Sequence, residues 1–82
     1  MMFQERAITR ENLEKVLRVL DSDEGVRIDN KSSYIFVNRT SNRYCIDISI
    51  DNKDEFIYKN SADEVMDFLK DHLNELSKIF AY

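Results

Sequence analysis

The single cysteine and the single histidine are the residues of this sequence best suited to nucleophilic or acid–base chemistry. Nucleophilic catalysis needs a nucleophile, an adjacent base and a group that orients the base. Cys45 lies within a run of strand character, where a lone cysteine usually serves as a small half-buried apolar side chain. His72 lies beside an apolar helical stripe, and nothing in the spacing pairs it with Cys45. The sequence therefore predicts a protein without enzymatic activity or catalytic residues.

Metal and phosphate sites also find no support in the composition. One glycine and no proline exclude a glycine-rich phosphate loop, and one cysteine with one histidine excludes a zinc cluster and an internal disulfide. Two acid-rich segments, residues 21–25 and 51–55, faintly match the spacing of a calcium loop. Neither has the twelve-residue pattern with its central glycine and terminal glutamate. We therefore expect solvated turns in both segments, no bound metal and no cofactor.

A row of four acids is the most specific chemical pattern in the chain. Asp63, Asp67, Asp71 and Glu75 recur at every fourth position of a predicted C-terminal helix. Consecutive carboxylates would rise by about 6 Å along its axis, and like charges at this spacing cost a few tenths of a kcal/mol each. The row predicts a negative ridge that docks on a basic groove of a larger protein. A solvated, acid-rich helix face is the alternative.

Aromatic residues on the predicted strands form a second candidate surface. Four of them can face away from the helices: Tyr34, Phe36, Phe56 and Tyr58. Neighbouring side chains on a strand lie on opposite faces, so either the aromatic residues or the aliphatic residues between them must point away from the core. An outward aromatic patch predicts a homodimer or a partner surface. Packing beneath a terminus and base stacking in an RNA-binding sheet are the alternatives, although the net charge of -4 disfavours direct nucleic-acid binding.

Two helices are expected to position these surfaces. The first follows an N-cap at Thr9, has its apolar stripe at residues 13, 16, 17 and 20, and stops within residues 21–25. The second opens with a capping box at Ser61 and Glu64. Its apolar stripe continues as far as Phe80, which predicts a helix of about five turns.

Between the helices, runs of period-two character predict an antiparallel sheet. Strands are expected at residues 26–29, 34–38 and 43–51, and a less distinct edge strand at 55–59. Short polar segments between them are typical of hairpin turns. The 82 residues then form one α+β domain in the order helix, three- to four-stranded antiparallel sheet, helix, with both helices on one face of the sheet.

The sequence also gives an expectation for the cellular location of the protein. A lone cysteine suits a reducing cytoplasm better than a secreted setting. The longest uninterrupted apolar run, residues 34–37, is far shorter than the roughly 20 residues of a membrane span. The N-terminal residues have no apolar run that could serve as a signal peptide. We therefore expect a cytoplasmic protein that makes no contact with membranes.

In outline, this short acidic helix–sheet–helix chain, poor in glycine and proline, resembles small inhibitors from phages and mobile elements, of the anti-CRISPR type. The resemblance covers architecture and charge over the whole chain and involves no signature residues. It implies that the basic partner is a nucleic-acid-processing complex such as a CRISPR nuclease. One acid per 6 Å is about half the charge density of a DNA strand, so mimicry of DNA would need further acids, for which Asp47 and Asp51 are the candidates.

Overall fold

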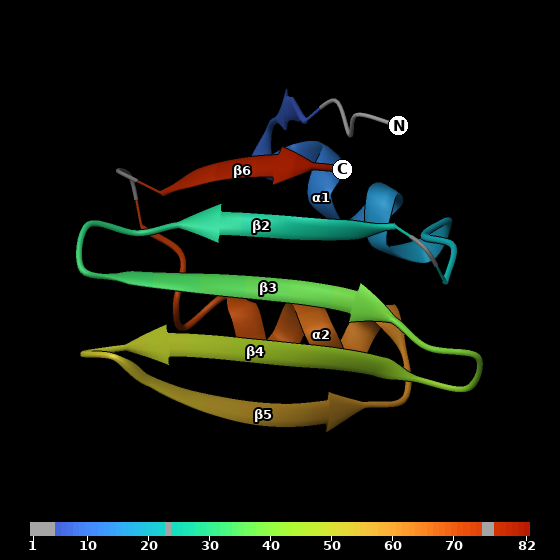
Figure 1. The fold of residues 1–82 in the computed structure, drawn as a ribbon. Helices are drawn as coiled ribbons and strands as arrows, with labels where there is room; N and C mark the ends of the chain where they lie inside the picture. Colours follow the sequence, from blue (N-terminus) through green and yellow to red (C-terminus); the bar gives the residue numbers. More distant parts are fainter. Residues whose placement is uncertain (1–4, 23, 75–76) are drawn as a thin grey trace.

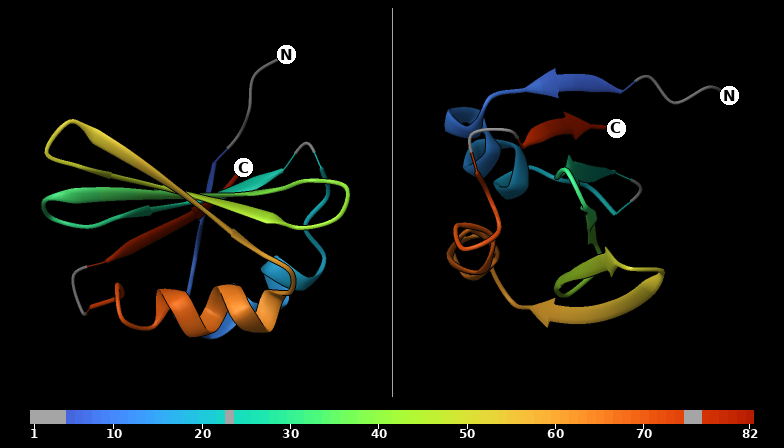
Figure 2. Two further views of the ribbon diagram at one scale, coloured as in Figure 1. Left: turned by 90° about the horizontal axis from the view of Figure 1, so that it is seen from below. Right: turned by 90° about the vertical axis from the view of Figure 1, so that its left-hand side faces the viewer.

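One antiparallel sheet with two helices on one of its faces forms the fold of this chain (Figures 1 and 2). The computed structural model describes residues 5–22, 24–74 and 77–82. Within them the elements are β1 (Arg6–Ile8), α1 (Arg10–Arg18), β2 (Gly25–Asp29), β3 (Ser33–Arg39), β4 (Tyr44–Ile50), β5 (Lys53–Lys59), α2 (Ala62–Leu69) and β6 (Lys78–Ala81). The six strands lie in the order β1-β6-β2-β3-β4-β5.

Local sequence signals account for both helix starts. The backbone N–H of Asn12 donates to Oγ1 of Thr9 at 3.3 Å, which is the N-cap predicted for α1. At α2, the N–H of Glu64 donates to Oγ of Ser61 at 3.2 Å, and the Glu64 carboxylate accepts from the N–H of Asn60 at 3.1 Å. Side chains therefore satisfy backbone donors at both starts that the helices themselves leave unpaired.

Strands β2 to β5 form a meander in which each strand pairs with its successor along the chain. The turn between β4 and β5 consists of Asp51 and Asn52, whose φ angles of 52° and 66° lie in the left-handed region. Aspartate and asparagine tolerate this region better than most residues, and two such residues match the twist of a tight hairpin. The meander confirms the four predicted strands.

The core fills the space between the sheet and the helices. Its fully buried large side chains come from both helices and from three central strands: Leu13, Leu17, Val26, Ile28, Ile35, Val37, Ile46, Val65 and Leu69. Tyr44 is also buried, and its hydroxyl donates to the backbone oxygen of Leu17 at 2.6 Å. This hydrogen bond ties α1 to the sheet beneath it.

The predicted long C-terminal helix is wrong beyond its second turn. Helix α2 ends at Leu69, and Ile79 and Phe80 lie in strand β6, between β1 and β2. Around Asn74 and Ser77 the chain turns: the N–H of Asn74 donates to Oγ of Ser77 at 3.0 Å, and the N–H of Ser77 donates to the Asn74 carbonyl at 3.1 Å. Such local bonds compete with a helix, and β6 gains two ladders of sheet hydrogen bonds.

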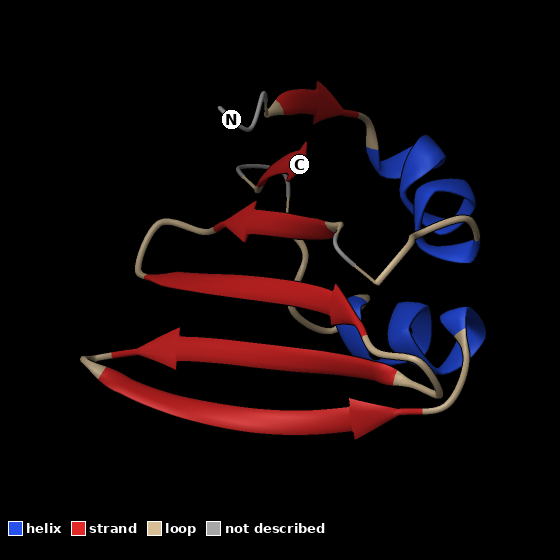
Figure 3. Ribbon diagram, turned by 45° about the vertical axis from the view of Figure 1, so that its right-hand side comes forward, coloured by secondary structure: helices blue, strands red, loops and turns tan. Residues whose placement is uncertain are grey.

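Two strands were therefore missing from the prediction of three to four. Strand β1 has three residues and β6 has four, too few for a clear alternation of apolar and polar side chains. Both lie at one side of the sheet, close to the two chain ends (Figure 3). The predicted order of helix, sheet and helix is not matched, because a strand precedes α1 and another follows α2.

Candidate functional site

The sheet face turned away from the helices carries no covering element among the described residues (Figure 2). We call it the outer face; it faces the viewer in Figure 1. Three parallel rows of side chains cross it, as the strand register requires. The central row runs from β6 to β5 and consists of Phe80, Arg27, Phe36, Asp47 and Phe56.

Two further rows flank the central row. One consists of Lys78, Asp29, Tyr34, Ser49 and Asp54. The other consists of Tyr82, Gly25, Asn38, Cys45 and Tyr58. A Cβ at Gly25 would lie 2.6 Å from the Tyr82 hydroxyl and from Oδ1 of Asn38, so a larger residue here would displace these two side chains. The Tyr82 hydroxyl donates to that Asn38 oxygen at 3.1 Å.

The predicted outward aromatic residues all belong to this face. Tyr34, Phe56 and Tyr58 expose 51%, 57% and 51% of their surface, and Phe36 is half-buried between charged neighbours. The aliphatic residues that alternate with them, such as Ile35 and Val37, point into the core. The predicted placement is confirmed, and the role of these side chains in docking stays a prediction.

Arg27 is a cation fixed in the central row. Its guanidinium carbon lies 4.7 Å from the centre of the Phe80 ring, and its Nη1 donates to Oε1 of Glu5 at 2.8 Å. Its Nε lies 3.0 Å from Oδ1 of Asp29, an ion pair whose angle falls short of a hydrogen bond. The side chain is 27% exposed. Ring stacking and two carboxylates therefore hold the charge in one position on the outer face.

Asp47 is the opposite case, an anion without an ion-pair partner among the described residues. It lies between Phe36 and Phe56 in the register, and its buried Oδ1 receives no hydrogen bond from the described part of the chain. Desolvation raises the pKa of the Asp47 carboxyl, and the nearby charge of Asp54 raises it further. An unsatisfied buried acceptor costs about 1–3 kcal/mol. The outer face therefore carries a half-buried carboxylate whose negative charge a cation from outside the chain would stabilise.

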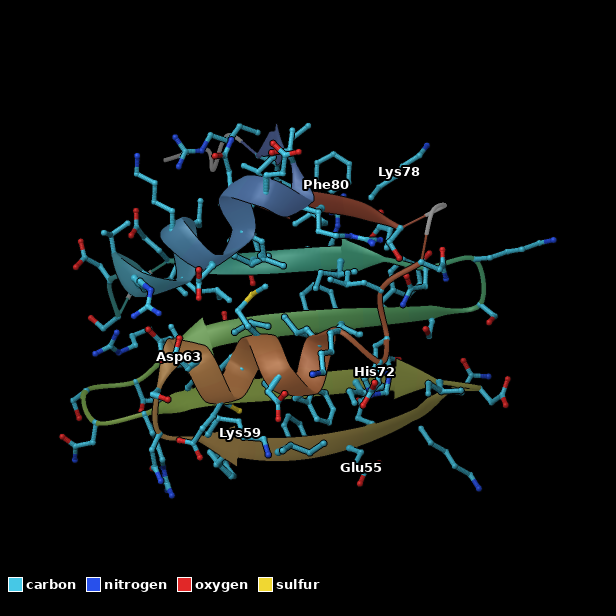
Figure 4. All side chains as sticks on the ribbon, turned by 180° about the vertical axis from the view of Figure 1, so that it is seen from behind. Glu55, Lys59, Asp63, His72, Lys78 and Phe80 are labelled. Carbon is cyan, nitrogen blue, oxygen red and sulfur yellow. The ribbon has the colours of Figure 1, made fainter. Side chains whose placement is uncertain are left out.

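The acidic ridge does not form as predicted. Because α2 ends at Leu69, Asp71 lies in the turn after the helix, and Glu75 lies outside the described residues. Asp63 forms an ion pair with Arg18 of α1, and Asp67 forms one with Lys70 at 3.1 Å. Figure 4 shows Asp63 at the start of α2 and His72 beyond its other end. Two of the predicted acids thus have cationic partners within the chain.

The two further acids, Asp47 and Asp51, do not extend that row. Asp47 is on the outer face, and Asp51 occupies the tight turn between β4 and β5. Neither is on the helix side of the sheet with the acids of α2. The six predicted acids therefore do not make one surface.

Cys45 and His72 lie on opposite sides of the sheet. Cys45 is a free, half-buried thiol in an outer-face row. His72 follows α2 on the helix side, where its ring lies 4.6 Å from the Phe68 ring, centre to centre. No group of three or more metal-ligating side chains occurs among the residues described, and none of their helices is both long and apolar enough to cross a membrane.

Sequence reasoning missed one side of the outer face. Phe80 and Lys78 were assigned to the C-terminal helix, and Arg27 was not considered as part of a surface. The sequence carries no clear signal for this strand, because residues 79–82 are all apolar and the alternation of buried Ile79 and Ala81 with Phe80 follows only from the pairing of β6. Comparison with protein-family models, curated proteins and solved structures gave no match to this chain.

Proposed function

We propose that this chain is a non-enzymatic protein-interaction module that docks through its outer face. The proposal rests on three aromatic side chains, Tyr34, Phe56 and Tyr58, which are about half exposed on a sheet face that neither of the described helices covers. Exposed apolar patches of this kind usually mark partner surfaces. Aromatic residues and arginine are also the types enriched in protein interfaces.

The charges on the outer face support a protein partner over RNA. Asp29, Asp47 and Asp54 lie among the aromatic side chains, where they would repel phosphates. The guanidinium carbon of Arg43 lies 4.4 Å from the centre of the Tyr58 ring, so it occupies a ring face on which a base would stack. RNA-binding sheets need open aromatic faces and a positive surface.

Inhibition of a larger basic partner, such as a nucleic-acid-processing complex, is the second proposal. It relies on the acids of α2, whose side chains are well exposed, with 71% for Asp63 and 76% for Asp67. Arg18 and Lys70 already offset these two charges at short range. The acids would therefore add long-range attraction to a partner, and the outer face remains the better-supported contact surface.

Site-specific photo-crosslinking tests the proposal in cells that produce the protein. A benzoylphenylalanine replaces Tyr58 on the outer face, Asp67 on α2, or the exposed Lys15 on α1 as the matched control. We expect a light-dependent protein adduct from position 58 and none from position 15. Adducts confined to position 67 would support the acidic surface instead. A nucleic-acid adduct at position 58, or equal labelling at all three positions, would overturn the proposal.

A further inference from the structure

We infer that the occupant of the outer face is a second copy of this chain, related to the first by a twofold axis that runs along β3. The inference rests on the proposed function, because it names the partner of the same surface. Strand β3 is the middle one of the five strands from β6 to β5, with β2 and β6 on one side and β4 and β5 on the other. Strand β1 extends beyond β6 and adds only Ala7 to the central row. The axis would therefore divide the rows into two halves.

The axis fixes which strands meet. Two sheets that pack face to face lie about 10 Å apart, with strand directions within about 30° of each other. A twofold axis along β3 places β2 of one copy opposite β4 of the other and β6 opposite β5. Strand β3 then faces its own copy. Every contact away from the axis occurs twice, as in any isologous interface.

The central row becomes self-complementary under this operation. Arg27 on β2 lies opposite Asp47 on β4 of the second copy, so two contacts of opposite charge form. Each would bring a cation to the exposed side of the Asp47 carboxylate, which has no ion-pair partner among the described residues of its own chain. Nη2 of Arg27 is suited to this, since Nη1 already donates to Glu5 and Nε lies within ion-pair distance of Asp29. At the row's ends, Phe80 lies opposite Phe56, and aromatic pairs of this kind are favourable.

The flanking rows follow the same rule. Lys78 on β6 lies opposite Asp54 on β5 of the second copy, which adds a second type of oppositely charged contact. In the other row Tyr82 lies opposite Tyr58. Asp29 lies opposite Ser49, whose hydroxyl is a hydrogen-bond donor. Charge, aromatic surface and hydrogen bonding therefore match between the two halves of the face.

Other arrangements of two copies lack this match. An axis in the interface plane but perpendicular to the strands would place Arg27 opposite Arg27 and Asp47 opposite Asp47, with repulsion in both cases. Pairing through the free edge of β5 is also disfavoured, because Lys53, Glu55 and Lys59 are charged residues along that strand. The chain is 24 to 29 Å across, so one face is comparable to the roughly 800 Å² that each partner contributes to a standard interface.

Charge reversal with complementation tests the inference by sedimentation equilibrium. We expect the unchanged protein to be a dimer at micromolar concentration, and R27E or D47K alone to raise the dissociation constant by about tenfold or more, since each creates two like-charge contacts. The R27E chain is acidic at positions 27 and 47, and the D47K chain is basic at both. When the two variants are mixed, they should therefore form a heterodimer. K15E on α1 is the matched control and should dimerise as the unchanged protein does.

Because Arg27 also forms ion pairs with Glu5 and Asp29, R27E could reduce dimerisation simply by destabilising the fold. A second pair of charge-reversal variants controls for this. K78E and D54K change exposed side chains, and should show the same loss alone and the same recovery when mixed. If circular dichroism shows that the variants are folded but neither pair dimerises when its two members are mixed, the proposed axis is wrong. A chain that stays monomeric at several hundred micromolar would overturn the inference. If position 58 then still crosslinks to a different protein, the proposed function stands without it.

Discussion

The two faces of this sheet alternate along the same strands, yet they carry different chemistry. The inner face presents branched aliphatic side chains such as Ile28, Ile35 and Ile46, which the two helices cover completely. The outer face presents aromatic rings that alternate with Arg27 and Asp47 across the strands. Aliphatic side chains contribute buried volume, whereas rings and charges contribute directional contacts. The difference indicates that the inner face stabilises the fold and that the outer face is available for binding.

Truncation of a core residue should give the largest effect. Leu69→Ala or Ile46→Ala should lower the free energy of unfolding by about 2–5 kcal/mol, because each side chain is fully buried between the helices and the sheet. Phe56→Ala removes a larger side chain from the outer face and should cost about 1 kcal/mol or less in the dilute protein. Urea denaturation measures the change in unfolding free energy for the core variants and for Phe56→Ala. Equal losses from the two faces would contradict the division of roles.

Removal of the hydroxyl that links the inner face to α1 should give the next largest effect. Tyr44→Phe leaves the ring in the core but deletes the donor to the Leu17 carbonyl, which is then buried without that partner. The Leu17 carbonyl still accepts from the N–H of Leu20, so we expect a loss of up to about 1.5 kcal/mol in the free energy of unfolding. Tyr34→Phe on the outer face deletes a hydroxyl from a half-exposed ring and is the control. A loss as large in the control would show that the phenol itself, and not the bond to α1, is responsible.

The helix cap should contribute less. Ser61→Ala removes the oxygen that accepts from the N–H of Glu64, at a cost of about 1 kcal/mol. Ser41→Ala, in the exposed turn between β3 and β4, is the matched control. Thermal unfolding followed by circular dichroism would separate the two variants. If they unfold at the same temperature, the cap does not stabilise α2.

The smallest expected effect depends on pH. The raised pKa of Asp47 means that the folded chain retains its proton to a higher pH than the unfolded chain, so stability decreases as pH rises from about 3.8 through the folded pKa. Asp47→Asn removes this penalty and should stabilise the dilute monomer at pH 7 by about 0.5 kcal/mol or less. The gain should shrink towards pH 4. Urea denaturation at both pH values tests this, and a gain independent of pH would contradict the titration of Asp47.

Local patterns were sufficient to predict much of the inner face. The capping serine Ser61, the stripe of α1 and the alternation in β3 and β4 each depend on residues close together in the sequence, and all are present in the structure. The end of α2 was not predictable in this way. Residues 79 and 80 continue the apolar stripe, and only pairing with β1 and β2 makes them a strand.

The outer face was predicted only in part, for a related reason. Period two was sufficient to place Tyr34 and Phe36 opposite the core residues beside them. The alignment of Phe80, Arg27 and Asp47 in one row depends on the register of strands that are distant in sequence. The acidic ridge failed because it needed a helix longer than the eight residues of α2. Patterns within one element can be predicted, whereas patterns across elements need the tertiary structure.

The position of β6 has a consequence for how the chain folds. Strand β1 pairs in the sheet with β6, and Ala7 lies opposite Phe80. Pairing β1 with β6 closes a loop that contains most of the chain, and this step is slow compared with forming the hairpins of the meander. Strand β1 therefore has no place in the sheet until β6 is available to pair with it. A chain truncated before residue 78 would retain β2 to β5 but would leave Arg6–Ile8 unpaired and open to proteases.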